Sequence, residues 1–228
     1  MTAAVKPESK GEITMKFEKK AVIFDLDGVI CFTDKFHYQA WKALADRLGI
    51  YFDEKINDRL RGVSRMASLE IILERSTVSY TQEEKEAFAT EKNDTYRELL
   101  KNMSPADLTD EVRDTLVELR NRGYKLSIGS SSKNTKFILE RIGLGDFFDA
   151  IADGTDITRS KPDPEVFLKS AEKIGIDPAD CAVVEDAKAG IEAAKAGGMT
   201  ALALFGDAKG CGLEDYDLKS FGDLLNIL

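Results

Sequence analysis

Short apolar runs of strand-forming residues recur along this chain, and helical stretches separate them. The runs occupy 21–26, 125–129, 150–152, 182–184 and 200–205. The first is apolar at nearly every position rather than at alternate ones, which is typical of a strand buried on both faces. Short strands that alternate with helices predict a parallel sheet with crossover helices. We therefore expect an α/β fold with a Rossmann-like sheet core.

One long stretch has no convincing strand. Between 33 and 103 roughly seventy residues pass with helical periodicity, which is far longer than an ordinary connection between a strand and a helix. Helices are predicted near 34–48, 53–60, 66–75 and 82–101. Thr81, followed by Glu84, forms a capping box at the start of the last helix. The stretch is therefore interpreted as an inserted α-helical domain.

The predicted domain organisation has three parts. Residues 1–18 are polar and mixed in charge, without a signal peptide or a membrane span, and are interpreted as a disordered lead-in. The α/β core is discontinuous and consists of 19–32 and 104–228. The helical insert at 33–103 separates its two segments.

Composition excludes several classes of partner. The chain has 41 acidic and 32 basic residues, so its formal charge of −9 argues against a nucleic-acid or membrane partner. Cys31, Cys181 and Cys211 are odd in number and widely spaced, which indicates neither a zinc site nor a disulfide framework and favours a reducing cytoplasm. Neither GxxxxGK[ST] nor GxGxxG occurs, which weakens the case for a nucleotide cofactor.

Two acidic pairs follow two of the predicted strands. Asp25 and Asp27 end the first run, and Glu185 and Asp186 follow 182–184. The carboxyl ends of parallel strands form one edge, so we expect these four carboxylates to gather there and to bind a cation. Oxygen ligands without His or Cys suit Mg²⁺. The alternatives are a polar turn for the first pair and helix N-terminal charge for the second.

A phosphate group also needs cationic and hydroxyl partners. Ser130, Ser131 and Ser132 follow the strand at 125–129, and Lys133 and Asn134 are expected in the first turn of the next helix, whose N–H groups favour an anion. Lys161 lies in a Ser-Lys-Pro turn. Taken singly, Ser130 is more often a helix cap and Lys161 a solvated lysine.

The four motifs together resemble the haloacid dehalogenase superfamily, over residues 20–205. DxDG follows the first strand, a serine follows the next, and a Lys-Pro turn precedes an acidic pair. The resemblance implies that Asp25 is the nucleophile that forms an aspartyl phosphate and that Asp27 is the general acid/base. Ser130 and Lys161 would hold the transferring phosphoryl group. The implied magnesium site consists of Asp25, Asp27 through its backbone carbonyl, Glu185 and Asp186.

Within that superfamily the insert looks like the cap of the β-phosphoglucomutase family. The similar segments are 60–65, 36–44 and 92–94, together with 132–134 in the core. The resemblance implies that the substrate is a phosphosugar, that β-glucose 1,6-bisphosphate is the intermediate of a mutase, and that a second phosphate clamp is formed by Arg65, Ser132, Lys133 and Asn134. The implied sugar-facing residues are His37, Trp41, Arg61, Gly62, Ser68, Lys92 and Asn93. The alternatives are an ordinary helix residue for His37, a core residue for Trp41 and an exposed helix-start charge for Arg65.

Four positions depart from that family's pattern. Phe32 stands where Asp is usual, Arg61 where Lys is frequent, Ser131 where Ala is frequent and Ala187 where Ser is common. Phe32 lies at the expected hinge between the insert and the core. Two rival functions stay open, namely a sugar-phosphate phosphatase of the same superfamily and a non-catalytic phosphosugar-binding protein. A monomer is expected, because one chain supplies the whole site.

Overall fold

The computed structural model describes residues 16–60 and 63–228, and a parallel six-stranded sheet forms its centre. The strand order is β3-β2-β1-β4-β5-β6. The strands are β1 (Ala21–Phe24), β2 (Lys125–Gly129), β3 (Ala150–Ala152), β4 (Cys181–Glu185), β5 (Thr200–Ala203) and β6 (Tyr216–Asp217). The predicted α/β fold with a Rossmann-like sheet is confirmed.

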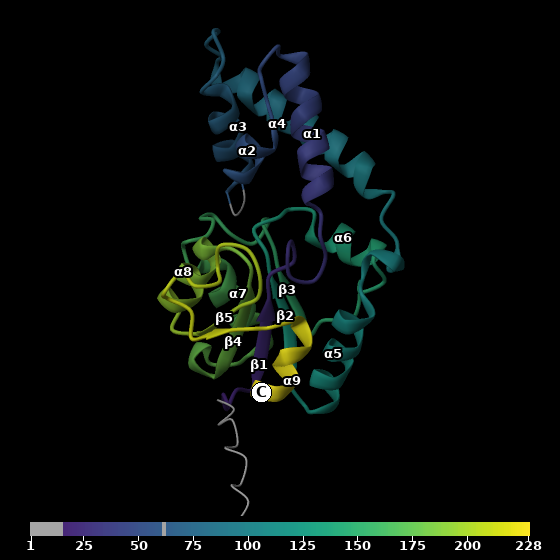
Figure 1. Ribbon diagram of the computed structural model, residues 1–228, viewed down its shortest axis with the longest axis vertical. Helices are drawn as coiled ribbons and strands as arrows, with labels where there is room; N and C mark the ends of the chain where they lie inside the picture. Colours follow the sequence, from purple (N-terminus) through teal and green to yellow (C-terminus); the bar gives the residue numbers. More distant parts are fainter. Residues whose placement is uncertain (1–15, 61–62) are drawn as a thin grey trace, which may run out of the picture.

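Helices cover both faces of the sheet (Figure 1). On one face α5 (Asp110–Asn121), α6 (Thr135–Arg141) and α9 (Leu224–Ile227) pack against Val22 and Phe24 of β1. On the other, α7 (Glu165–Ile174) and α8 (Lys188–Ala196) pack against Ala21 and Ile23. Successive side chains of a strand point to opposite faces, so two covering layers explain why all four residues of β1 are apolar and fully buried.

The long segment without strands forms four helices above the carboxyl ends of the strands (Figure 1). These cap helices are α1 (Asp34–Arg47), α2 (Glu54–Asp58), α3 (Arg65–Leu73) and α4 (Gln82–Leu100). They enclose a separate apolar cluster that includes Trp41, Leu69 and Ile72. At the base of α1 and α4, Phe36 and Tyr96 belong instead to the cluster of the sheet core.

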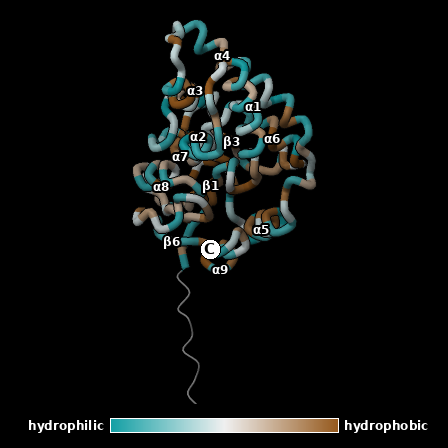
Figure 2. The backbone as a smooth tube through the Cα atoms, turned by 45° about the horizontal axis from the view of Figure 1, so that its top comes forward, coloured by the Kyte–Doolittle hydropathy of each residue, from teal (hydrophilic) through white to brown (hydrophobic). Residues whose placement is uncertain are grey.

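The colouring of Figure 2 agrees with this layered packing, because hydrophilic and hydrophobic residues both occur along α5 and α6. Helices with one buried face produce such a pattern. None of the helices in the described ranges has the length and apolar character that a membrane span requires.

Most predicted elements are present, with shifted ends. The predicted helices at 53–60 and 66–75 are shorter in the structure, where they span Glu54–Asp58 and Arg65–Leu73. The strands predicted at 21–26 and 200–205 end at Phe24 and Ala203, and β6 was not predicted. The capping box of Thr81 and Glu84 is confirmed.

The domain boundaries stay an interpretation, although one contact bears on the N-terminal boundary. Phe17 lies in the segment interpreted as a disordered lead-in, yet its N–H donates to the carbonyl of Ile227 at 2.8 Å. Its ring also meets that of Tyr216 edge-on, with centroids 6.4 Å apart. Residues 1–15 of that segment lie outside the described ranges.

Candidate active site

A cavity of about 850 Å³ lies between the carboxyl ends of the strands and the cap helices. Both acidic motifs, the 130–134 loop, Lys161 and α1, α3 and α4 contribute to its lining. The predicted site residues that line it are Asp25, Asp27, His37, Trp41, Arg65, Ser68, Lys92, Asn93, Ser130, Ser131, Ser132, Lys133, Asn134, Lys161, Glu185 and Asp186. Arg61 and Gly62 lie outside the described residues.

Lys161 links two buried carboxylates at the floor of the cavity. Its Nζ lies 2.5 Å from Oδ1 of Asp25 and 2.5 Å from Oε1 of Glu185. Asp25 directly follows β1 and Glu185 ends β4, and these two strands are neighbours in the sheet. Burial by itself lowers the pKa of Lys161, but the two carboxylates outweigh burial and raise it above its ordinary value. Lys161 is therefore a permanent cation at the floor of the cavity.

The floor carries more negative than positive charge. Carboxylate oxygens of Asp25, Glu185 and Asp186 lie within 4.8 Å of one another, and Lys161 is the cation bonded to this group. Burial, with help from neighbouring carboxylates, raises the pKa of Asp25 to about 7 and that of Asp186 to about 8. A divalent cation would relieve this repulsion. An all-oxygen donor set fits Mg²⁺, so the residues present suit that ion.

Two glycines allow this acidic cluster to form. A Cβ added to Gly28 would overlap the carboxylate of Asp186, and one added to Gly190 would overlap that of Glu185. Gly28 also has φ +89°, a backbone conformation that side-chain-bearing residues rarely adopt. The other carboxylate oxygen of Glu185 accepts from the N–H groups of Asp186 and Ala187 at 2.8 and 2.9 Å. The carboxylate of Glu185 is thus held by backbone N–H groups as well as by Lys161.

Asp27 lines the same cavity but its carboxylate stands apart from the acidic cluster. It accepts a hydrogen bond from the hydroxyl of Thr33, the residue that precedes α1. Burial raises the pKa of Asp27 to about 6, and the Thr33 hydroxyl opposes that rise. The expectation that four carboxylate side chains gather together is therefore wrong for Asp27. The turn after β1 directs its side chain toward the cap linker instead.

The 130–134 loop follows β2 and begins with a local turn. The hydroxyl of Ser130 accepts from the N–H of Ser132 at 3.2 Å, and that of Ser132 accepts from the N–H of Asn134 at 3.2 Å. The prediction that Lys133 and Asn134 lie in the first turn of the helix is wrong, because α6 begins at Thr135 and Asn134 precedes it. These side-chain bonds favour a turn over the helix at this point.

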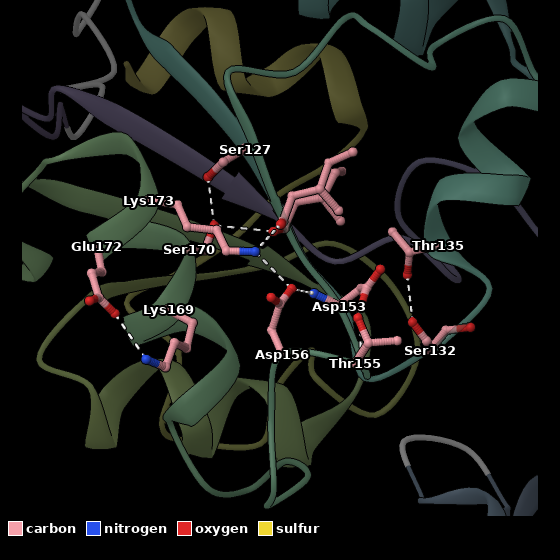
Figure 3. Close-up of polar contacts among 12 residues, drawn as sticks. Ser127, Ser132, Thr135, Asp153, Thr155, Asp156, Lys169, Ser170, Glu172 and Lys173 are labelled. Atoms are coloured by element: carbon pink, nitrogen blue, oxygen red, sulfur yellow. Dashed lines mark hydrogen bonds and ion pairs between the residues drawn. The ribbon is translucent and has the colours of Figure 1, made fainter.

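The loop after β3 supports the 130–134 loop from behind. The N–H of Gly154 donates to the carbonyl of Ser132 at 3.1 Å, and a Cβ at Gly154 would overlap the carbonyl of Ser131. The buried Asp153 accepts from the N–H and hydroxyl of Thr155 at 2.8 and 2.6 Å. Figure 3 shows this contact, with Asp156 and Lys173 joined beside it at 2.8 Å.

A hydrogen-bonded chain joins the cap helices to the core. Oδ1 of Asn93 in α4 accepts from the Arg65 guanidinium in α3 at 2.8 Å and from Nδ2 of Asn134 at 3.0 Å. Arg65 is the first residue of α3, which agrees with the alternative interpretation of it as a charge at a helix start. Its guanidinium nevertheless donates to Asn93. Arg65 and Asn134, two members of the predicted second phosphate clamp, are thus linked through the side chain of Asn93.

Lys92 is buried among aromatic rings on the cap side. Its Nζ lies 2.9 Å from Nδ1 of His37, 4.6 Å from the ring centroid of Trp41 and 4.7 Å from that of Tyr96. Burial, together with the nearby positive charge of Arg65, lowers the pKa of Lys92 to about 7. Burial also lowers the pKa of His37 well below its usual range. Trp41 both lines the cavity and belongs to the cap's apolar cluster, so the two interpretations of it coexist.

Sequence reasoning missed several residues that shape the site. Thr33 holds Asp27, and Tyr96 stacks on His37 with ring centroids 4.1 Å apart. Gly154 supports the 130–134 loop. A tyrosine one helical turn after Lys92 in a predicted helix was the signal available for Tyr96. The roles of Thr33 and Gly154 depend on contacts that no local pattern specifies.

Three of the four departures from the family pattern lie in the described residues. Phe32 is 54% exposed and its ring lies 6.1 Å from that of Phe205, in the segment after β5. Oγ of Ser131 is shielded from solvent and has no hydrogen-bond partner in the structure. The N–H of Ala187 bonds to Glu185, a contact that a serine would also make.

Comparisons with known proteins agree with this arrangement. A family model for haloacid dehalogenase-like hydrolases matches residues 19–198. A β-phosphoglucomutase of Bacillus subtilis is 44% identical over 185 residues, which cover 80% of this chain and 82% of that protein. A phosphorylated carbohydrates phosphatase of Thermotoga maritima is 32% identical over 79% of this chain and 82% of that protein.

Comparison with solved structures agrees with these sequence similarities. The crystal structure of a β-phosphoglucomutase from Clostridium difficile superimposes with a TM-score of 0.84 at 36% identity, covering 90% of this chain and 93% of the other. The sheet order, the position of the acidic cluster and the sequence similarity lead to one conclusion. The chain belongs to the haloacid dehalogenase-like hydrolase family, and within it resembles the β-phosphoglucomutases.

Proposed function

We propose that this protein is a mutase that interconverts β-D-glucose 1-phosphate and glucose 6-phosphate. The observation that carries the proposal is that one cavity is lined by two separate groups of charged and hydrogen-bonding side chains, to each of which we assign one phosphate group. Asp25, Ser130 and Lys161 form the first group. Arg65 and Asn134, linked through Asn93, form the second. A phosphatase needs one such group, whereas a mutase that turns over a sugar bisphosphate needs two.

Asp25 is proposed as the nucleophile. Its carboxylate oxygen attacks the phosphorus atom of the sugar phosphate, an O–P bond forms to Asp25, and the bond from phosphorus to the sugar oxygen breaks. Lys161 holds the carboxylate in place at 2.5 Å. Mg²⁺, held by Asp25, Glu185 and Asp186 together with the backbone carbonyl of Asp27, would supply positive charge against the transferring phosphoryl group.

Asp27 is proposed as the general acid and base. It protonates the leaving sugar oxygen and later takes the proton from the hydroxyl that receives the phosphoryl group. In this structure its carboxylate accepts from Thr33, so it must leave that hydroxyl to reach the substrate. The bound β-glucose 1,6-bisphosphate then reverses its orientation, and the second group of side chains takes the phosphate that does not react.

The cavity is large enough for this ligand. Its volume of about 850 Å³ lies within the range of about 300 to 1,000 Å³ typical of small-molecule sites. The cap helices form its upper wall and would exclude water from the aspartyl phosphate. The predicted sugar-facing residues of the described ranges, namely His37, Trp41, Ser68, Lys92 and Asn93, line that wall.

Phosphorus NMR tests the proposal. β-Glucose 1-phosphate is followed with Mg²⁺ and a trace of glucose 1,6-bisphosphate, using the native protein and Asp25→Ala. Formation of glucose 6-phosphate without inorganic phosphate, and only when Asp25 is present, supports the mutase. Steady release of inorganic phosphate would replace it with the alternative, a sugar-phosphate phosphatase, which the similarity to the Thermotoga maritima phosphatase favours.

The remaining expectations are part of this proposal. A non-catalytic phosphosugar-binding protein is disfavoured because Asp25, Asp27 and Lys161 are all present. A reducing cytoplasm fits the three cysteines, each of which is free in the structure. We further propose that the enzyme acts as a monomer, without nucleic-acid or membrane partners.

A further inference from the structure

We infer that Lys173 and Asp156 are positioning residues, which hold the loop after β3 so that the 130–134 loop keeps the shape in which it binds phosphate. This inference rests on the proposed function, because it assigns a role to an ion pair behind the proposed phosphate site. Both side chains lie outside the lining of the cavity. The central observation is that their 2.8 Å ion pair belongs to a network of hydrogen bonds that ends at the carbonyl of Ser132.

Lys173 lies in the last turn of α7 and connects this helix to the edge of the sheet. Its ammonium donates to the carbonyl of Ile151 at 2.7 Å and lies 2.8 Å from Oδ2 of Asp156. Because β3 is an edge strand, a carbonyl on its open side needs a partner from outside the sheet, and Lys173 supplies it for Ile151. Figure 3 shows the ammonium joined to Asp156. One cation therefore binds both the strand and the loop that follows it.

Asp156 fixes the shape of the loop after β3. Its Oδ2 accepts from the N–H of Asp153 at 3.0 Å, and its own N–H donates to the carbonyl of Asp153 at 2.9 Å. The buried carboxylate of Asp153 in turn accepts from the N–H and the hydroxyl of Thr155. These bonds close residues 153–156 into one turn, and the ion pair with Lys173 attaches this turn to α7.

Gly154 connects the 153–156 turn to the 130–134 loop. Its N–H donates to the carbonyl of Ser132 at 3.1 Å. A Cβ added at Gly154 would overlap the carbonyl of Ser131 and the side chain of Lys133, so the two segments are packed against each other without a gap. A shift of the 153–156 turn must therefore either move the 130–134 loop or break its bond to Gly154.

The position of the 130–134 loop should control the affinity for phosphate. This loop contributes Ser130, Lys133 and Asn134 to the lining of the cavity. Hydrogen bonds weaken steeply when donors leave their preferred distance and angle, so a small displacement of several donors lowers affinity. Side chains that support a binding site from behind act in this way without touching the ligand. Fixing the loop before the ligand arrives also reduces the cost of ordering it on binding.

Calorimetric titration of the full-length protein with inorganic phosphate in a Mg²⁺ buffer tests the inference. Lys173→Met removes the ammonium but keeps an apolar stem, and phosphate affinity should fall by about threefold to tenfold. Asp156→Ala should cause a loss of similar size, because it removes the acceptor that Lys173 and the Asp153 N–H share. Lys173→Arg keeps a cation with several donors and should recover most of the lost affinity.

Lys169→Met is the matched control. Lys169 lies one turn before Lys173 on α7 and pairs with Glu172 at 3.1 Å, as Figure 3 shows. This substitution removes an ion pair from the same helix but leaves the 153–156 turn attached, so phosphate affinity should not change. If Lys173 served only the stability of α7, Lys173→Met would lower the melting temperature and leave the phosphate affinity of the folded protein at the native value.

The outcomes separate this inference from the proposed function. Native phosphate affinity in Lys173→Met would overturn the inference, as would an equal loss in Lys169→Met. Equal losses in Lys173→Arg and Lys173→Met would also overturn it, because the cation would then not be what positions the loop. If the native protein binds no inorganic phosphate, the inference and the proposed function fail together. Release of inorganic phosphate from β-glucose 1-phosphate counts against the mutase alone, since a phosphatase would use the same loop and the affinities of the variants would still decide.

Discussion

Lys161 Nζ lies 2.5 Å from the carboxylate of Asp25, and 136 residues of sequence separate the two. The same ammonium lies 2.5 Å from Glu185, so a single cation serves two buried carboxylates. The proposed nucleophile is therefore fixed by a partner on a distant turn. This dependence leads to the first prediction.

Lys161→Met should destabilise the metal-free protein strongly. Breaking a buried ion pair by removing one partner costs roughly 3–5 kcal/mol, because a buried charge is left uncompensated. The free energy of unfolding, measured by urea denaturation in EDTA, should fall by about this amount, and Mg²⁺ should restore part of it. Lys169→Met removes an exposed pair with Glu172 and is the control, with an expected loss below about 1 kcal/mol. Equal losses for both variants would contradict the prediction.

Lys92 should make the stability of the protein depend on pH. Its pKa is lowered from 10.5 to about 7 by burial, so between these values the unfolded chain binds a proton that the folded chain does not. The free energy of unfolding should rise with pH across this window. The cost of burying a charged Lys92 is fully present below about pH 7, and it disappears as the pH approaches 10.5. Lys92→Met should therefore stabilise the protein by a few kcal/mol at pH 6 and by much less at pH 10.

Thermal unfolding of the native protein and of Lys92→Met at pH 6, 8 and 10 measures this effect. Lys85→Met is a suitable control, because Lys85 lies on the same helix and bonds to Glu70 near the surface. If Lys92→Met stabilises the protein equally at all three pH values, the buried charge of Lys92 is not the cause, because better packing alone would then account for the effect.

Gly154→Ala should weaken phosphate binding by displacing the 130–134 loop. The added Cβ would overlap the carbonyl of Ser131 and crowd Lys133, so the 130–134 loop must shift. Shifts of this kind typically cost about 1–3 kcal/mol in stability. Calorimetric titration with inorganic phosphate should show at least about a tenfold loss of affinity. Gly210→Ala, where a Cβ meets no neighbouring atom, should leave phosphate affinity unchanged, although its positive φ adds local strain.

Phe32 and Phe205 should be energetically coupled. Their ring centroids are 6.1 Å apart, and such pairs contribute about 0.5–1.5 kcal/mol beyond the burial of area. Because Phe32 is 54% exposed, we expect a value near the lower limit. A double-mutant cycle with Phe32→Ala and Phe205→Ala, measured by urea denaturation, gives the coupling. If the stability losses of the two single variants simply add up in the double variant, Phe32 does not stabilise the contact between the cap linker and the core.

The fold could be predicted because its determinants are local. Apolar runs that are continuous rather than alternating indicated a sheet covered on both faces, and β1 is indeed fully buried. The seventy or so residues without strand signals indicated helices, and Thr81 marked the start of α4. Element ends were less accurate, because Arg65 begins its helix after the capping side chain of Ser64, and Thr135 begins its helix after the side-chain hydrogen bonds of the 130–134 loop.

The site was only partly determined by the sequence. Strand-end motifs identified Asp25, Lys161, Glu185 and Asp186 as candidates, because the carboxyl ends of parallel strands share one edge. The tertiary structure decided that Asp27 is directed to Thr33, that Asn93 bridges Arg65 and Asn134, and that Lys92 is buried among rings. The contacts of Asn93 and the Lys92–His37 contact join residues far apart in the chain, and their geometry depends on how the cap helices pack above the sheet rather than on any local pattern.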